Sequence, residues 1–107
     1  MSRQLLDAFT RLLTLDTRAC AQLFTRDAEF RTHLGSHELC FLGRQEILTF
    51  LHHVPRQVIF RAENTREEQD GFAAEILVLP DGLPPHRRSL RYAVEQGRFK
   101  RFHLQPH

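Results

Sequence analysis

The stretch from residue 23 to residue 53 most constrains how this chain can fold. It reads LFTRDAEFRTHLGSHELCFLGRQEILTFLHH. Residues 27–33 alternate between apolar and polar side chains, so Ala28, Phe30 and Thr32 share one side of a half-buried strand. Segments with apolar residues at helical spacing lie on both sides of that strand. This order of elements predicts a curved sheet packed on helices.

Periodicity and turn residues extend the prediction to the whole chain. Helices are expected near residues 2–13, 17–24 and 44–54, the last one stopped by Pro55. Strands are expected at 27–33, 38–42, 57–66, 72–79, 87–95 and 98–104. The predicted fold class is therefore α+β, with three N-terminal helices on one face of a curved, mostly antiparallel sheet.

Size and composition limit the classes of protein that this chain can represent. Its 107 residues predict one domain spanning 1–107, and 41% hydrophobic and 26% charged residues are typical of a soluble globular protein. No segment has the length of a membrane span or the pattern of a leader, so we expect a cytoplasmic location and no membrane partner. A net charge of +2 is too small to predict a nucleic-acid partner.

The cysteines and histidines do not form a recognisable metal or redox motif. Cys20 and Cys40 have no C-x-x-C spacing, and we interpret both as reduced, buried small residues. The chain holds seven histidines, but no three ligands stand at a workable metal spacing. We therefore predict neither a metal nor a cofactor.

Several short motifs, each weak alone, occur in an order that is fairly specific. They are Leu23-Phe24 before Asp27-Ala28, the helix start Gly43-Arg44-x-x-Ile47, Asn64 before the Asp70-Gly71 turn, and the closing GRFKRF. With the order of helices and strands, they make the chain resemble the nuclear-transport-factor-2-like (NTF2-like) superfamily, especially its SnoaL-like branch.

The resemblance implies a cone-shaped α+β barrel with a pocket between the sheet and the helices, and commonly a homodimer packed through the outer sheet face. Because the superfamily hosts isomerases, dehydratases, cyclases and domains without activity, it does not imply one function. We predict a protein that binds a small, partly apolar organic molecule, either without catalysis or as a cofactor-free enzyme of the isomerase, dehydratase or cyclase type. The alternative is a non-catalytic, homodimeric domain for binding or for protein interaction. Thr32 stands where steroid-isomerase-like members keep their carboxylate base.

The last hairpin supplies the candidate polar residues. With a two-residue turn at Gln96-Gly97 and strict alternation, Tyr92, Arg101 and His103 share the more apolar, concave face. There His103 would be the general acid or base, Tyr92 a hydrogen-bond donor and Arg101 the anchor for an anionic substrate. The alternative is that all three face solvent at the rim.

Further residues are predicted to line the pocket or the opposite face. Asn64 corresponds to a pocket asparagine of SnoaL-like sequences. Phe30, Thr32 and Phe60 are predicted wall residues, and Cys40 is a further candidate beside them. A group of basic residues is predicted to form a stripe on the convex face, as solvated charge or as ion pairs at a dimer interface, beside a small apolar patch. These residues are Arg87, Arg88, Arg91, Arg98 and Lys100, with Ala93 and Phe102.

Overall fold

The structure, a computed structural model, describes residues 2–106 and contains three helices and six strands within them. The helices are α1 (Ser2–Leu15), α2 (Thr17–Ala21) and α3 (Arg44–Leu51). The strands are β1 (Phe24–Leu34), β2 (His37–Leu42), β3 (Ile59–Glu68), β4 (Gly71–Leu79), β5 (His86–Glu95) and β6 (Arg98–Pro106). The predicted α+β class and order of elements are confirmed, including the short strand β2.

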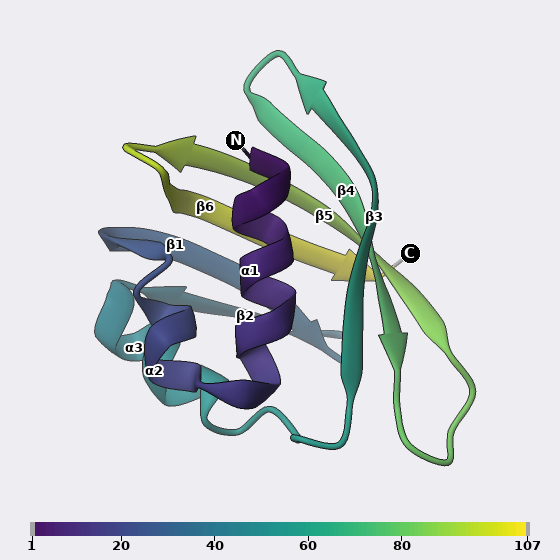
Figure 1. Cartoon of the computed structure of the whole chain (residues 1–107). Coiled ribbons are helices and arrows are strands. Elements are labelled where there is room, and N and C mark those ends of the chain that lie inside the picture. The colour runs from purple at the N-terminus through teal and green to yellow at the C-terminus, as the bar shows by residue number, and fades with distance from the viewer. Residues whose placement is uncertain (1, 107) are drawn as a thin grey trace.

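The strands form one curved sheet in the order β2-β1-β6-β5-β4-β3. Neighbouring strands are antiparallel except β1 and β6, which are parallel. The helices cover one face of the sheet, here called the inner face, and the opposite face is the outer face (Figure 1). The sheet is not closed, because β2 and β3 are its two edges, so the cone is an open one.

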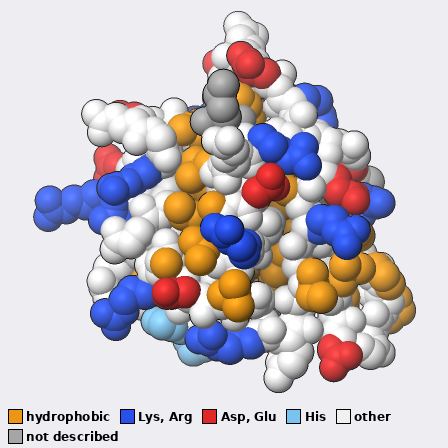
Figure 2. Space-filling model, viewed as in Figure 1, with side chains coloured by type: hydrophobic (Ala, Val, Ile, Leu, Met, Phe, Trp, Pro, Cys, Tyr) orange, Lys and Arg blue, Asp and Glu red, His pale blue; other side chains and the backbone are white. Residues whose placement is uncertain are grey.

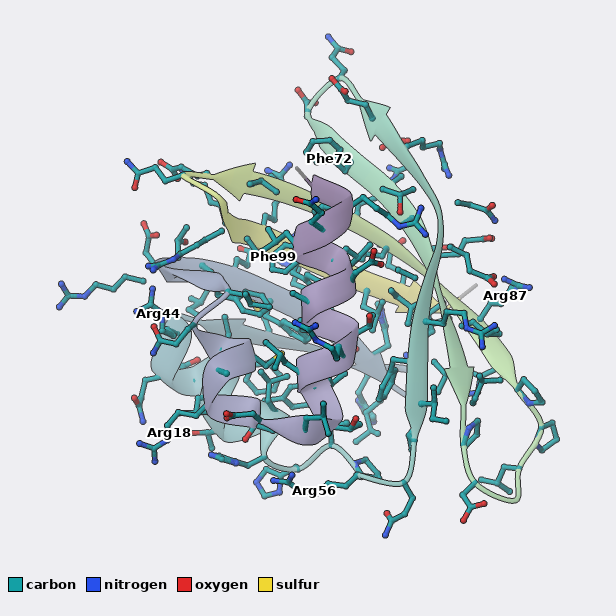
Figure 3. The ribbon with its side chains drawn as sticks, in the orientation of Figure 1. Arg18, Arg44, Arg56, Phe72, Arg87 and Phe99 are labelled. Atoms are coloured by element: carbon teal, nitrogen blue, oxygen red, sulfur yellow. The ribbon has the colours of Figure 1, made fainter. Side chains whose placement is uncertain are left out.

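The helices form where the sequence supplies apolar faces and caps. Leu6, Phe9 and Leu13 recur at helical spacing along α1 and are all buried. The Asp16 side chain accepts a hydrogen bond from the backbone N–H of Ala19 at 3.0 Å and caps α2. At the start of α3, Arg44 donates two hydrogen bonds to the Phe24 carbonyl, at 3.1 and 2.8 Å, and so fixes the helix to β1 (Figure 3).

Phenylalanine rings fill the space between α1 and the inner face of the sheet. Phe9 of α1 meets Phe24, Phe99 and Phe102, with ring centroids 4.6–5.9 Å apart. Phe30 stacks on Phe102, with centroids 5.0 Å apart and planes 9° from parallel. Such pairs stabilise a core beyond the area that they bury. The residues of β1 and β6 in this cluster thereby define the inner face.

The predicted register of the last hairpin is wrong beyond its first two pairs. Val94 lies opposite Phe99 as predicted, but Ala93 lies opposite Arg101, so Lys100 is an extra residue in a β-bulge. The bulge reverses the predicted faces of the rest of β6. Phe102, predicted to be on the convex face, is fully buried inside. Its position allows Phe99 and Phe102 to enter the same core.

The two cysteines occupy different environments. Cys20 is fully buried, and burial together with the nearby charge of Asp16 raises its pKa to about 12. Cys40 on the edge strand β2 is exposed, so the prediction that it is buried beside Thr32 is wrong.

No helix within residues 2–106 is long and apolar enough to cross a membrane.

Candidate functional site

The main cavity lies under the curved sheet, where the inner face separates from the helices. Its volume is about 730 Å³, within the range of roughly 300–1,000 Å³ that is usual for small-molecule sites. Its deep walls are almost entirely apolar. They include Phe9 and Leu13 of α1, Phe50 and Leu51 of α3, and Phe30, Phe60, Ile76, Val78 and Phe102 of the sheet.

Three of the predicted wall residues line this cavity. Phe30 and Thr32 reach it from β1, and Phe60 reaches it from β3. Thr32 is only 6% exposed and brings a hydroxyl group to an otherwise apolar wall. None of the described residues that line the cavity is an aspartate or a glutamate. A hydroxyl group at its ordinary pKa cannot replace a carboxylate base. What Thr32 offers there is a group that donates or accepts a hydrogen bond.

Polar side chains gather where the cavity opens to solvent. His33 at the end of β1, His53 after α3, and His86 and Arg88 at the start of β5 contribute to this mouth. The loop of residues 80–85 completes the rim and brings Leu83, which is 67% exposed. Figure 2 shows hydrophobic side chains at the lower right, where the loop between β4 and β5 lies in Figure 1. The mouth is thus basic on one side and apolar on the other.

Tyr92, Arg101 and His103 do not line this cavity, but all three line a separate hollow of about 620 Å³ beside the Asp70-Gly71 turn. Tyr92 is 1% exposed, stacked on Phe72 and packed edge-on against Phe99. Arg101 is exposed and donates to the Asp70 carbonyl at 3.2 Å, near the turn between β3 and β4. The prediction that the three share the concave face is therefore wrong, because the Lys100 bulge moves Arg101 and His103 to the outer face.

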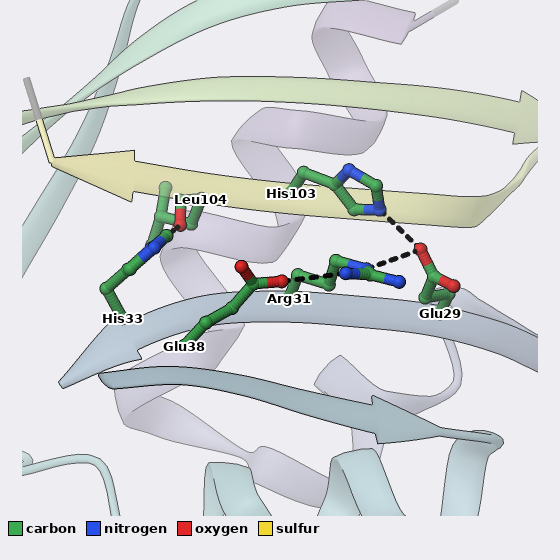
Figure 4. A network of polar contacts seen from close by, with 6 residues as sticks. All are labelled: Glu29, Arg31, His33, Glu38, His103 and Leu104. Atoms are coloured by element: carbon green, nitrogen blue, oxygen red, sulfur yellow. Dashed lines mark hydrogen bonds and ion pairs between the residues drawn. The ribbon is translucent and has the colours of Figure 1, made fainter. Parts of the chain in front are cut away.

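His103 belongs to a network of charges on the outer face (Figure 4). Its Nε2 atom lies 2.6 Å from Oε2 of Glu29, and the same oxygen accepts a hydrogen bond from Nε of Arg31 at 3.0 Å. Arg31 also donates to Glu38 at 2.7 Å. The hydrogen bonds from Arg31 and then His103 lower the pKa of the Glu29 carboxyl. The roles of His103 as general acid or base and of Tyr92 as hydrogen-bond donor stay predictions.

Asn64 lies outside the apolar cavity. It stands in a bulge of β3 with a left-handed backbone, φ 54°, and its side-chain amide donates to Glu75. With Glu63 and Arg87 it lines a polar cleft beside the N-terminal half of α1. A role in binding substrate therefore stays a prediction, and in this structure it would concern that cleft.

Arg88 is the lining residue that the sequence analysis placed on the wrong face. It lies opposite Ile76, and the next inward residue of β5, Leu90, is 1% exposed. Strict alternation back from Leu90 and Tyr92 would have placed Arg88 on the inner face. The predicted convex stripe wrongly included Arg88, because Arg87, Arg88 and Arg91 were grouped by charge and not by their position along the strand.

The outer face keeps the other charges of the predicted stripe. Arg87 pairs with Glu63 and lies 3.9 Å from Glu75. Figure 3 shows its side chain on the side of the sheet away from α1. Lys100 pairs with Glu95 at 3.0 Å.

Among residues 2–106 no group of three or more His, Cys, Asp and Glu side chains is placed to hold a metal ion.

This open cone of six strands over three helices, with a cavity between the layers, defines the NTF2-like fold. The predicted resemblance is confirmed by comparison with solved structures. An NTF2-like protein of unknown function from Cytophaga hutchinsonii superposes with a TM-score of 0.76 at 14% identity, over 97% of this chain and 88% of the other. The likeness at this identity concerns the fold.

Two further matches have enzyme descriptions. A provisionally assigned polyketide cyclase from Sinorhizobium meliloti gives a TM-score of 0.77 at 16% identity, covering 95% of this chain and 94% of the other. The epoxide hydrolase/cyclase-like enzyme SalBIII, with a role in pyran ring formation in salinomycin, gives 0.77 at 14% identity, covering 96% and 88%. No protein-family model matches the chain. No curated protein matches it either.

Proposed function

We propose that this protein binds a small, largely apolar organic molecule in the cavity under the sheet. The observation that carries the proposal is a space of about 730 Å³ whose walls are apolar and aromatic. Transfer of apolar surface from water to such a wall is favourable by roughly 25 cal/mol per Å². A ligand of matching shape would gain most of its binding energy from this burial.

The polar groups of the site fit a few specific contacts. Thr32 offers one hydroxyl group deep in the wall, and the other polar groups, among them His33, His86 and Arg88, stand at the mouth. Convergence of a few polar groups on an apolar cavity is typical of small-molecule sites. The likeness to a cyclase and to an epoxide hydrolase/cyclase-like enzyme is consistent with this class of ligand.

The chemistry that such a site could perform differs from carboxylate-based proton transfer. The described lining has no aspartate or glutamate, so any proton transfer would fall to the histidines among the lining residues. Isomerisation, dehydration or cyclisation would then have to occur at the mouth, with the apolar body of the substrate in the cavity. Binding is the function that we propose, and catalysis would be added to it.

A neutral fluorescent probe tests the proposal directly. N-phenylnaphthylamine, which gains fluorescence in apolar surroundings, should bind the wild-type protein saturably at one molecule per chain. Leu104→Trp places a larger ring in the cavity wall and should weaken binding about tenfold or more. The matched control is Leu42→Trp, since Leu42 is 59% exposed on the edge strand and lies outside the cavity.

The two variants separate cavity binding from surface adsorption. If wild-type protein does not bind the probe, or if Leu104→Trp and Leu42→Trp bind it as the wild type does, the cavity is not the site. Circular dichroism and urea denaturation should show that both variants are folded.

A second candidate function is self-association through the outer face. Ile59 is 61% exposed there and lies directly opposite Leu79. Leu77, two residues along β4 on the same face, is half-buried. This apolar strip would be covered in a homodimer that uses the sheet, and exposed apolar patches often mark such interfaces. It is compatible with a ligand in the cavity, which opens elsewhere.

A further inference from the structure

Arg88 is unusual among the arginines of β5 because its side chain belongs to the inner face. In an antiparallel sheet, residues directly opposite each other project to the same side. Arg88 pairs with Ile76, and His86 pairs with Val78. Ile76 and Val78 are buried residues of the cavity wall. Arg88 and His86 are thus consecutive inward positions at the cavity mouth.

The guanidinium group of Arg88 is only partly paired by the rest of the protein. Its Nη1 atom donates to the backbone carbonyl of His33, at 3.4 Å, across the mouth. Within residues 2–106 Arg88 forms no ion pair, whereas Arg87 and Arg91 on the outer face both meet glutamates. A guanidinium carries five N–H donors, so most of those of Arg88 remain for a ligand.

The surroundings of Arg88 favour one kind of ligand group. Among the described residues of the lining, Arg88 is the one permanent cation, and it stands where an apolar cavity meets solvent. A half-buried cation at such a boundary is stabilised by an anion. The planar guanidinium matches a carboxylate through two parallel hydrogen bonds. A phosphate dianion would call for more than one permanent positive charge.

We propose that the occupant of the cavity is a monocarboxylate with an apolar body, bound with its carboxylate at Arg88 and its body against Phe30, Phe60 and Val78. This inference rests on the proposed function and adds the ligand class and the residue that recognises it. His86, the preceding inward residue of β5, also lines the cavity and offers a second hydrogen-bonding side chain near Arg88.

The test compares two ligands that differ in one end group. Decanoate and decanol have the same apolar body, and their affinities for the wild-type protein are measured near neutral pH by isothermal titration calorimetry. Decanoate should bind more tightly. Arg88→Met keeps an apolar stem but removes the charge, and it should weaken decanoate binding about tenfold while leaving decanol binding unchanged.

Two further variants control for charge and folding. Arg91→Met removes the same charge from the outer face of the same strand, where Arg91 is 74% exposed beside Glu68, and it should change neither affinity. Arg88→Lys keeps the charge without the planar fork and should retain a preference for decanoate over decanol. Both variants of Arg88 should bind decanol as the wild type does, which also shows that the cavity is intact.

The outcomes distinguish this inference from the proposed function. If both ligands bind equally and Arg88→Met changes neither, the carboxylate site is overturned while the cavity remains a binding site. If neither ligand binds wild-type protein, both proposals fail. Tighter binding of decyl phosphate than of decanoate would overturn the choice of a carboxylate.

Discussion

At the scale of single residues, Glu29 links the charge network of the outer face to folding stability. Its carboxylate accepts hydrogen bonds from Arg31 and His103, which hold its pKa below the ordinary value of 4.5. A group whose pKa is lower in the folded state stabilises the fold fully above its unfolded pKa. That contribution is lost as pH falls from about 4.5 through the lower folded value.

We therefore expect Glu29→Gln to make the free energy of unfolding less dependent on pH in the acid range. The free energy of unfolding of the wild type, measured in urea, should decrease more steeply below about pH 4.5 than that of the variant. The difference near neutral pH should be roughly 0.5 to 1 kcal/mol, because the pair is partly exposed. Glu67→Gln is the control, since Glu67 is exposed and has no ion pair within residues 2–106. Parallel pH profiles for wild type and Glu29→Gln would contradict the assignment.

At the scale of elements, the turn between β3 and β4 depends on the absence of a side chain. Gly71 has φ 149°, and a Cβ atom added there would collide with the carbonyl of Tyr92 on β5. This close approach allows β4 to start beside β5 and brings Phe72 onto the ring of Tyr92.

Gly71→Ala should lower the free energy of unfolding by about 2 kcal/mol, because it adds a clash to an unfavourable backbone conformation. Gly82→Ala is the matched control. Gly82 also has a left-handed backbone, φ 75°, but no atom lies within 4 Å of an added Cβ. It should cost about 1 kcal/mol or less. Equal losses in urea denaturation would show that the contact with Tyr92 does not matter.

The elements themselves could be predicted from the sequence, while the faces of the last strand could not by strict alternation. Phe30 and Thr32 were placed correctly because β1 alternates regularly over its buried part. In β6, Phe99 and Phe102 are three residues apart, so alternation assigns them to opposite faces. Burial of both rings requires the bulge at Lys100. The spacing of two phenylalanines was the available signal.

The bulge at Lys100 accounts for most of the errors in the predicted site. Arg101 and His103 were assigned to the cavity through the unbulged register, and both lie on the outer face. Arg88 was assigned to the outer face and lines the cavity. The loop of residues 80–85 carries no periodic pattern, so its position at the rim depends on tertiary structure. Walls made by regular strands could be predicted, and the mouth could not.

At the scale of the whole molecule, the two faces of the sheet suit different partners. The inner face encloses the cavity, and the outer face carries ion pairs around the strip of Ile59, Leu77 and Leu79. A stable dimer commonly covers about 800 Å² on each partner, which the outer face of a six-stranded sheet can supply. Ligand binding and self-association would therefore not compete for surface.

Sedimentation equilibrium tests the proposed dimer. Ile59→Arg places a charge in the strip and should shift the equilibrium from dimer to monomer by about tenfold or more in dissociation constant. Leu34→Arg is the control, because Leu34 is 70% exposed at the other side of the sheet. A monomeric wild type across the accessible concentrations would rule out this interface.

The loop between β4 and β5 has a consequence for the speed of binding. Pro80, Pro84 and Pro85 line the cavity at its rim, and each proline ring fixes its own backbone φ angle. A rim with so few conformations loses little entropy when a ligand arrives. The opening is already shaped before the encounter, so association should follow diffusion and orientation, and differences between ligands should appear mainly in how fast they leave.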